Sequence, residues 1–168
     1  MRALGPGSVS SLLKLVLDVI FLALWAALGL LLAAALLALL LPSDLPIWSR
    51  IEARGAVLSA GLLAFAVYVA VVLFITQRVR LIFTTLTVGD PFHPGNVARL
   101  RSIGFALAGL ELINYGVNLV TGWVFRDEFK TVRFPFNPTA WFAVLVVFVL
   151  AEVFREGARL RSEAELTI

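Results

Sequence analysis

Residues 89–104 read GDPFHPGNVARLRSIG and lie between two long apolar halves of a 168-residue chain. Gly89-Asp90-Pro91 is expected to turn the chain, and Pro94-Gly95 to turn it again, because these residue types favour turns over regular structure. Asn96 follows as a suitable N-cap for a helix that begins at Val97. The stretch therefore predicts a structured connection between two helices.

Three further side chains in this stretch have the chemistry of a membrane interface. Phe92 stands between two prolines and is expected either to dip into the interface or to pack under the loop. Arg99 and Arg101 flank the start of the next helix, at the level of lipid headgroups. The candidate loop motif comprises Gly89, Asp90, Pro91, Phe92, Asn96, Arg99 and Arg101.

The composition indicates a membrane protein. Hydrophobic residues make up 61% of the chain and charged residues 15%. A soluble domain is closer to half apolar and a quarter charged. The net charge of +3 does not point to nucleic acid, because the basic residues stand beside apolar segments, where membrane topology places them. We expect no direct binding of nucleic acid. The chain has no cysteine, which excludes disulfides and thiolate chemistry.

Four segments are expected to cross the membrane, since about 20 helical residues cross the hydrocarbon core of a bilayer. Their approximate ranges are 14–41, 55–80, 102–125 and 138–156. The first contains 23 residues without a charge, Val19–Leu41, which is longer than the apolar part of a signal peptide, so it is expected to be retained. Asn137-Pro138 predicts the start of the fourth helix. The fourth span is the weakest of the four predictions, because its uninterrupted apolar run is short.

The sequence thus predicts an all-α fold: an integral membrane four-helix bundle in a single domain, residues 1–168. Nine of the fourteen Lys and Arg residues fall on the side that holds both termini, which predicts that both termini are cytoplasmic. Trp48, Trp123 and Trp141 would then lie at the outer interface, where aromatic belts occur. The last helix is expected to extend into the cytoplasm, because Glu156–Arg159 and Arg161–Glu165 have the offsets of helical ion pairs.

Polar residues within the apolar segments form a second candidate site. Glu111, Asn114 and Asn118 share one helix face. Charged groups at membrane depth are costly, and they mark either a satisfied pair or a function. The candidate intramembrane cluster comprises Glu111, Asn114, Asn118, Glu152, Arg78, Lys14 and Asp18. The favoured interpretation is structural, with the acids held by neighbouring basic and polar groups. The alternative is a proton or ion pathway centred on Glu111.

Motifs for catalysis, metal binding and cofactor binding are absent from the sequence. His93 is the only histidine, and with Asp90 alone it falls short of a metal site. There is no glycine-rich phosphate loop and no nucleophile-elbow serine. The sequence predicts a protein that is not an enzyme and has no cofactor.

The loop and the tail together resemble a bacterial membrane family, the domain-of-unknown-function 2975 family. The matching pieces are Gly89, Pro91-Phe92, Asn96, residues 99–104 and the terminal run, residues 151–168. The resemblance implies a multi-pass, four-helix protein of the bacterial inner membrane. It also implies a frequent genetic neighbour, a small helix-turn-helix regulator. It implies no activity, cofactor or catalytic residue.

The functional prediction is a regulatory or accessory protein that acts through its cytoplasmic loop and tail. Its expected partners are the lipid bilayer and either a small helix-turn-helix regulator or other membrane subunits. Two alternatives remain open: a small ion or solute conduit centred on Glu111, and a structural subunit of a larger membrane complex.

Overall fold

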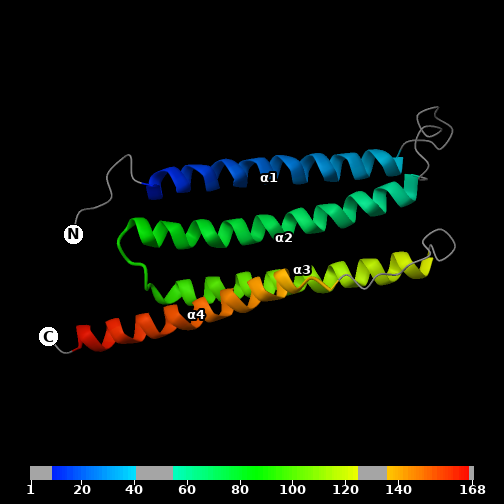
Figure 1. Ribbon diagram of the computed structural model, residues 1–168. Helices are drawn as coiled ribbons and strands as arrows, with labels where there is room; N and C mark the ends of the chain where they lie inside the picture. Colours follow the sequence, from blue (N-terminus) through cyan, green and yellow to red (C-terminus); the bar gives the residue numbers. More distant parts are fainter. Residues whose placement is uncertain (1–8, 41–54, 125–135, 167–168) are drawn as a thin grey trace. The chain divides into compact units, whose positions relative to one another are not determined.

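The computed structural model describes residues 9–40, 55–124 and 136–166 of the chain (Figure 1). Every regular element in these ranges is a helix, which confirms the predicted all-α fold with four helices. The helices are α1 (Val9–Leu40), α2 (Gly55–Thr87), α3 (Pro94–Val124) and α4 (Pro138–Glu165). The predicted positions of Trp48, of the Trp123 side chain and of the loop Arg126–Pro135 lie outside what the structure describes.

The described residues divide into two compact units. One contains α1 and α2 as far as Arg80. The other contains the last turns of α2 from Leu81, the loop that follows, α3 and α4. The loop and the tail of the sequence prediction therefore belong to the same unit. That the whole chain forms a single domain stays a prediction.

Within the part of the chain that the structure describes, three helices are long and apolar enough to cross a membrane. They are Leu12–Leu40 in α1, Leu58–Thr87 in α2 and Pro138–Ala164 in α4. The helix α4, expected to be the weakest span, is among these three. Glu111, Asn114 and Asn118 are polar residues within the otherwise apolar stretch of α3.

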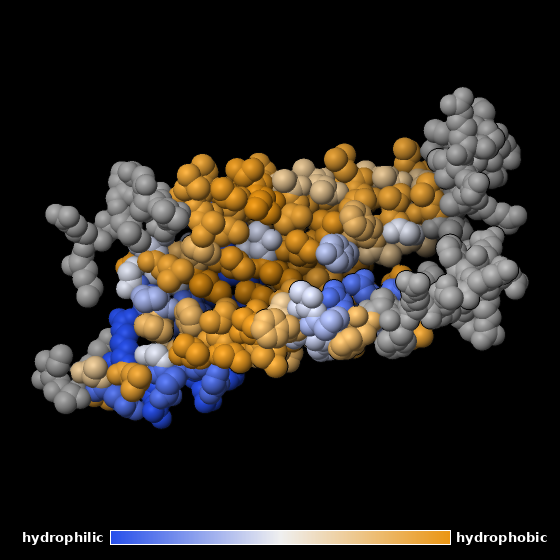
Figure 2. Space-filling view, in the orientation of Figure 1, coloured by the Kyte–Doolittle hydropathy of each residue, from blue (hydrophilic) through white to orange (hydrophobic). Residues whose placement is uncertain are grey.

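The apolar side chains of these helices are largely uncovered. Leu22 and Leu30 of α1 are each 72% exposed, and Phe142 of α4 is 66% exposed. Figure 2 shows hydrophobic residues over the visible face of α1 and hydrophilic residues gathered at the C-terminal end of α4. Large exposed apolar surfaces are unusual for a soluble protein and suit a lipid environment. The helices thus suggest a membrane protein.

In the second unit, α3 and α4 pack against each other in antiparallel directions. A Cβ added to Gly104, near the start of α3, would lie 3.0 Å from the Phe148 ring of α4. Phe148 also meets Phe105 edge-on, with ring centroids 5.2 Å apart. Closer to the other end, Trp141 Nε1 donates a hydrogen bond of 2.8 Å to the Tyr115 hydroxyl. The absence of a side chain at Gly104 thus leaves room for the Phe148 ring.

The start of α4 is as predicted. Asn137 Oδ1 accepts a hydrogen bond of 3.3 Å from the Ala140 backbone N–H, and Pro138 occupies the first turn. An N-cap asparagine satisfies a backbone donor that has no partner within the helix, and proline there loses no bond. Asn137-Pro138 therefore fixes where α4 begins.

Candidate functional site at the α2–α3 loop and the end of α4

The end of α2 turns sharply at Gly89. The Gly89 N–H donates to the Leu86 carbonyl at 3.1 Å, and the Asp90 N–H donates to the Thr85 carbonyl at 3.0 Å. These two bonds form a Schellman motif, which closes a helix with a residue of positive φ. Gly89 has φ +84°, a conformation that side chains with a Cβ rarely adopt. The glycine thus sets the direction in which the loop leaves α2.

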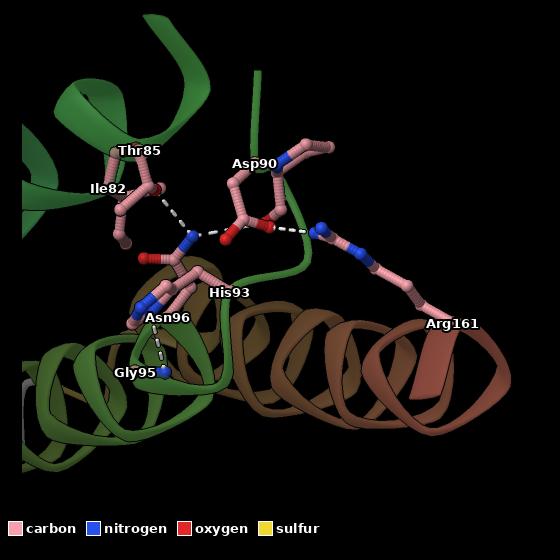
Figure 3. Close-up of polar contacts among 8 residues, drawn as sticks. Ile82, Thr85, Asp90, His93, Gly95, Asn96 and Arg161 are labelled. Atoms are coloured by element: carbon pink, nitrogen blue, oxygen red, sulfur yellow. Dashed lines mark hydrogen bonds and ion pairs between the residues drawn. The ribbon is translucent and has the colours of Figure 1, made fainter. Parts of the chain in front are cut away.

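Asn96 joins the loop to both flanking helices (Figure 3). Its side-chain amide donates to Thr85 Oγ1 of α2 at 2.7 Å and to the Pro91 carbonyl of the loop at 3.1 Å. Its Oδ1 accepts from Arg99 at 2.8 Å. The residue is 0% exposed. Buried polar groups are costly unless they are hydrogen-bonded, and here the amide nitrogen and the amide oxygen both have partners.

Arg99 also links the start of α3 to the end of α2. Besides Asn96, its guanidinium donates to the Leu81 carbonyl of α2 at 2.9 Å. Arg99 is half-buried, whereas Arg101 is exposed. Of the two arginines expected at headgroup level, Arg99 thus ties α3 to α2, and Arg101 is exposed and lies 3.8 Å from Glu152 of α4.

The predicted role of Asn96 as the cap of α3 is wrong. The helix begins at Pro94, so Asn96 already lies in its first turn. The capping contacts come from His93: its carbonyl accepts from the Asn96 N–H at 2.8 Å, and its Nδ1 accepts from the Gly95 N–H at 3.0 Å. Because Pro94 presets a helical φ, α3 starts earlier than an asparagine cap predicts.

Phe92 packs against the last part of α4. Its ring centroid lies 5.7 Å from that of Phe154. A Cβ added to Gly157 would lie 2.5 Å from two atoms of the Phe92 ring, a distance that real contacts do not reach. Gly157 therefore leaves the space that the ring fills. Phe92 is expected from the sequence either to dip into the membrane interface or to pack under the loop. In the structure its ring packs, and the surface it packs against is α4.

Two ion-pair groups surround this aromatic contact. Asp90 in the loop pairs with Arg161 of α4 (Figure 3), a contact between residues 71 positions apart. Glu152 of α4 pairs with Arg155 in the same helix and lies 3.8 Å from Arg101 of α3. The loop, the start of α3 and the end of α4 thus form one connected structure, which we call the loop–tail junction (residues 89–101 and 152–161).

Residues 41–168 match the family model described as "Protein of unknown function (DUF2975)". The chain belongs to the DUF2975 family. No curated protein and no solved structure matches the chain. The loop and the tail both lie within the matched residues, and in this DUF2975 protein they contact each other through Phe92, Phe154 and Gly157.

The residues of the second predicted site of the DUF2975 protein, the intramembrane polar cluster, take part in several separate contacts. Asp18 shares a helix face with Lys14, but it accepts from Arg80 Nε at 2.6 Å instead. The Arg80 guanidinium also lies 4.2 Å from the centre of the Phe21 ring. Lys14 is exposed. Arg80 is the partner that sequence reasoning missed, because it lies 62 positions from Asp18.

Arg78 is positioned by an aromatic ring. Its guanidinium lies 4.7 Å from the centre of the Phe74 ring, four residues earlier on α2. Its Nε is buried and makes no hydrogen bond with the described residues. Arg78 is therefore held by a cation–π contact, which is worth about 0.5–2 kcal/mol in proteins.

The acids and amides of α3 and α4 are also separate from one another. Glu152, assigned to the same candidate cluster as Glu111, belongs to the loop–tail junction, and its side chain is 54% exposed. Glu111 is half-buried, and the structure describes no hydrogen bond or ion pair for it within its own unit. Asn118 donates to the Asn114 carbonyl at 2.7 Å, one turn earlier in α3. Within the described residues, no group of three His, Asp or Glu side chains is placed to hold a metal ion.

Proposed function

We propose that this DUF2975 protein is a non-enzymatic integral membrane protein of the bacterial inner membrane, with both termini in the cytoplasm. Its role is regulatory or accessory, and the loop–tail junction is the surface through which it acts. The observation that carries the proposal is the contact of Phe92 with Phe154 and Gly157, reinforced by the Asp90–Arg161 ion pair.

This contact bears on topology. The end of α4 meets the loop that precedes α3, which supports a topology with the loop and the tail on the same side of the membrane. If α4 crosses the bilayer, α3 must cross it as well, since the two helices are antiparallel and joined at their far ends. The packing thus supports four spans. The excess of Lys and Arg on this side supports a cytoplasmic assignment.

The chemistry of the junction suits a protein partner. Arg101, Arg155 and Arg159 are exposed, and acidic side chains alternate with them along α4. A surface of mixed charge around an aromatic contact favours a folded protein with complementary charges over a polyanion. The family resemblance makes a small helix-turn-helix regulator the first partner to examine.

Co-purification of the tagged full-length chain in mild detergent tests this function. A soluble partner should be retained by wild type and by Phe142→Ala, a matched control on the exposed apolar part of α4, and it should be lost with Phe92→Ala. Retention of integral membrane proteins alone would favour a structural subunit. Equal retention of the soluble partner by Phe92→Ala would contradict a role for the junction.

A further inference from the structure

The last part of α4 has little stability of its own. Gly157 lies inside the helix, where glycine is unfavourable because of its backbone freedom. The segment after it, Ala158–Glu165, is too short to form a helix independently, so its helical form depends on the preceding turns of α4 and on packing. Its ion pairs, Glu156–Arg159 at 2.6 Å and Arg159–Glu163 at 3.6 Å, are exposed, and exposed pairs contribute little.

Contacts with the loop stabilise this segment. Phe154, Gly157 and Arg161 have the spacing i, i+3 and i+7, so they lie on one face of α4. Each of them contacts the loop: Phe154 and Gly157 meet the Phe92 ring, and Arg161 pairs with Asp90. The glycine that weakens the helix is thus also the position that admits the ring.

The loop in turn is held in a fixed shape from the other side. Gly89 sets its direction, and the buried amide of Asn96 binds it to Thr85 and Pro91. Phe92 and Asp90 therefore belong to a loop whose shape is fixed by other contacts. Of the two segments in the junction, the loop and the tail, the tail is the less stable.

We propose that the loop–tail junction is a latch: the end of α4 from Gly157 onward is helical while it is docked on Phe92 and Asp90, and the tail unfolds when the loop releases it. The closed latch is the state in the structure. This deepens the proposed function, because it is a regulatory device in the surface assigned to partner binding, but it can be tested without any partner.

Hydrogen exchange of backbone amides tests the latch in the full-length protein in lipid nanodiscs. Phe92→Ala should speed exchange of the amides at 158–165 by about tenfold, the factor expected for losing an aromatic contact. Amides at 142–150 of the same helix should be unaffected, which checks that the protein is folded. Phe142→Ala is the matched control, since it removes an equally large ring from an exposed position. Tail exchange equal to wild type in Phe92→Ala would overturn the latch.

Gly157→Ala should change hydrogen exchange of the tail in opposite directions for an independent tail and for a latch. Alanine is the better helix former, so in an independent tail it should slow exchange at 158–165. In a latch it displaces the Phe92 ring, and exchange should rise both in the tail and at 88–93. The double variant Phe92→Ala with Gly157→Ala removes the clash, so its tail should exchange more slowly than that of Phe92→Ala alone. Slower tail exchange in the single Gly157→Ala variant would overturn the proposal.

Reversing the charges of the Asp90–Arg161 pair tests the latch independently of the packing of Phe92. Asp90→Arg should speed exchange at 158–165, and the combination with Arg161→Asp should restore it toward wild type. Glu156→Gln, which removes an ion pair inside the tail, should change neither the loop nor the effect of Asp90→Arg. Failure of the double reversal to restore slow exchange would contradict a direct role for this pair.

Discussion

Asp90, the residue that follows the turn at the end of α2, forms an ion pair with Arg161 near the end of α4. The two residues are 71 positions apart, and the whole of α3 lies between them in the chain. Their pairing requires α3 and α4 to return the chain to the side on which α2 ends. The same geometry places Phe92 on Gly157. From this relationship follow the proposed four-span topology and the proposed functional surface.

Asn96→Ala should lower the free energy of unfolding by about 2–3 kcal/mol, because it leaves buried partners without the amide. The N-cap variant Asn137→Ala provides the comparison, with an expected loss of about 1 kcal/mol. Thermal or denaturant unfolding in one detergent measures both. An Asn96→Ala variant no less stable than Asn137→Ala would show that the buried amide does not hold the loop.

The ion pair between α1 and α2 predicts unequal roles for two neighbouring charges. Asp18→Asn should destabilise the protein by about 1–3 kcal/mol, since hydrogen bonds to charged groups are worth that much. Lys14→Gln should have almost no effect, because Asp18 pairs with Arg80 instead. Unfolding curves of the two variants under the same conditions check this. Equal destabilisation would favour the pairing of Lys14 with Asp18.

Much of this fold follows from residue types along the chain. Long runs without charge predict the helices, and Asn137 with Pro138 marks the start of α4 correctly. The start of α3 was missed, because His93 and Pro94 begin the helix before the asparagine that a simple capping rule selects. Local rules describe helix ends well only where a single residue type decides them.

The junction itself could not be derived from local pattern, because its contacts join distant parts of the chain. One signal was present in the sequence: Gly157 interrupts a charged segment that otherwise favours a helix. A glycine inside a helix often has a packing reason, and here that reason is the ring of Phe92. The partner of the glycine, however, is set by how α3 and α4 pack, which no local pattern specifies.

A variant of Glu111 distinguishes the proposed regulatory or accessory function from an ion or solute conduit. Glu111→Gln removes the charge and keeps the size, and we expect it to fold and to accumulate as wild type does. Proteoliposomes containing wild type should show no proton or ion flux above empty vesicles. A flux in wild type that Glu111→Gln abolishes would instead support the conduit.

Topology reporters test the arrangement across the membrane. Fusions after Ile168 and in the loop near Gly95 should both report the cytoplasm, and a fusion near Lys130 should report the periplasm. These assignments follow from the Lys and Arg distribution and from the contact of the loop with α4. Opposite sides for Gly95 and Ile168 would be incompatible with that contact.

Disulfide trapping tests the central claim, the contact between the loop and the tail, most directly. The chain has no cysteine of its own, so Phe92→Cys with Gly157→Cys introduces a single possible pair. A Cβ at Gly157 would lie 3.2 Å from Cγ of Phe92, which brings the two Cβ atoms near the roughly 3.5–4.5 Å separation of a disulfide. The control pair, Phe92→Cys with Leu145→Cys, separates the cysteines by a further 12 residues of helix, about 18 Å. Mild oxidation in native membranes, followed by proteolysis and mass spectrometry, should link the loop to the tail in the first pair and not in the control. Absence of that link, or equal linking in the control, would contradict the loop–tail junction.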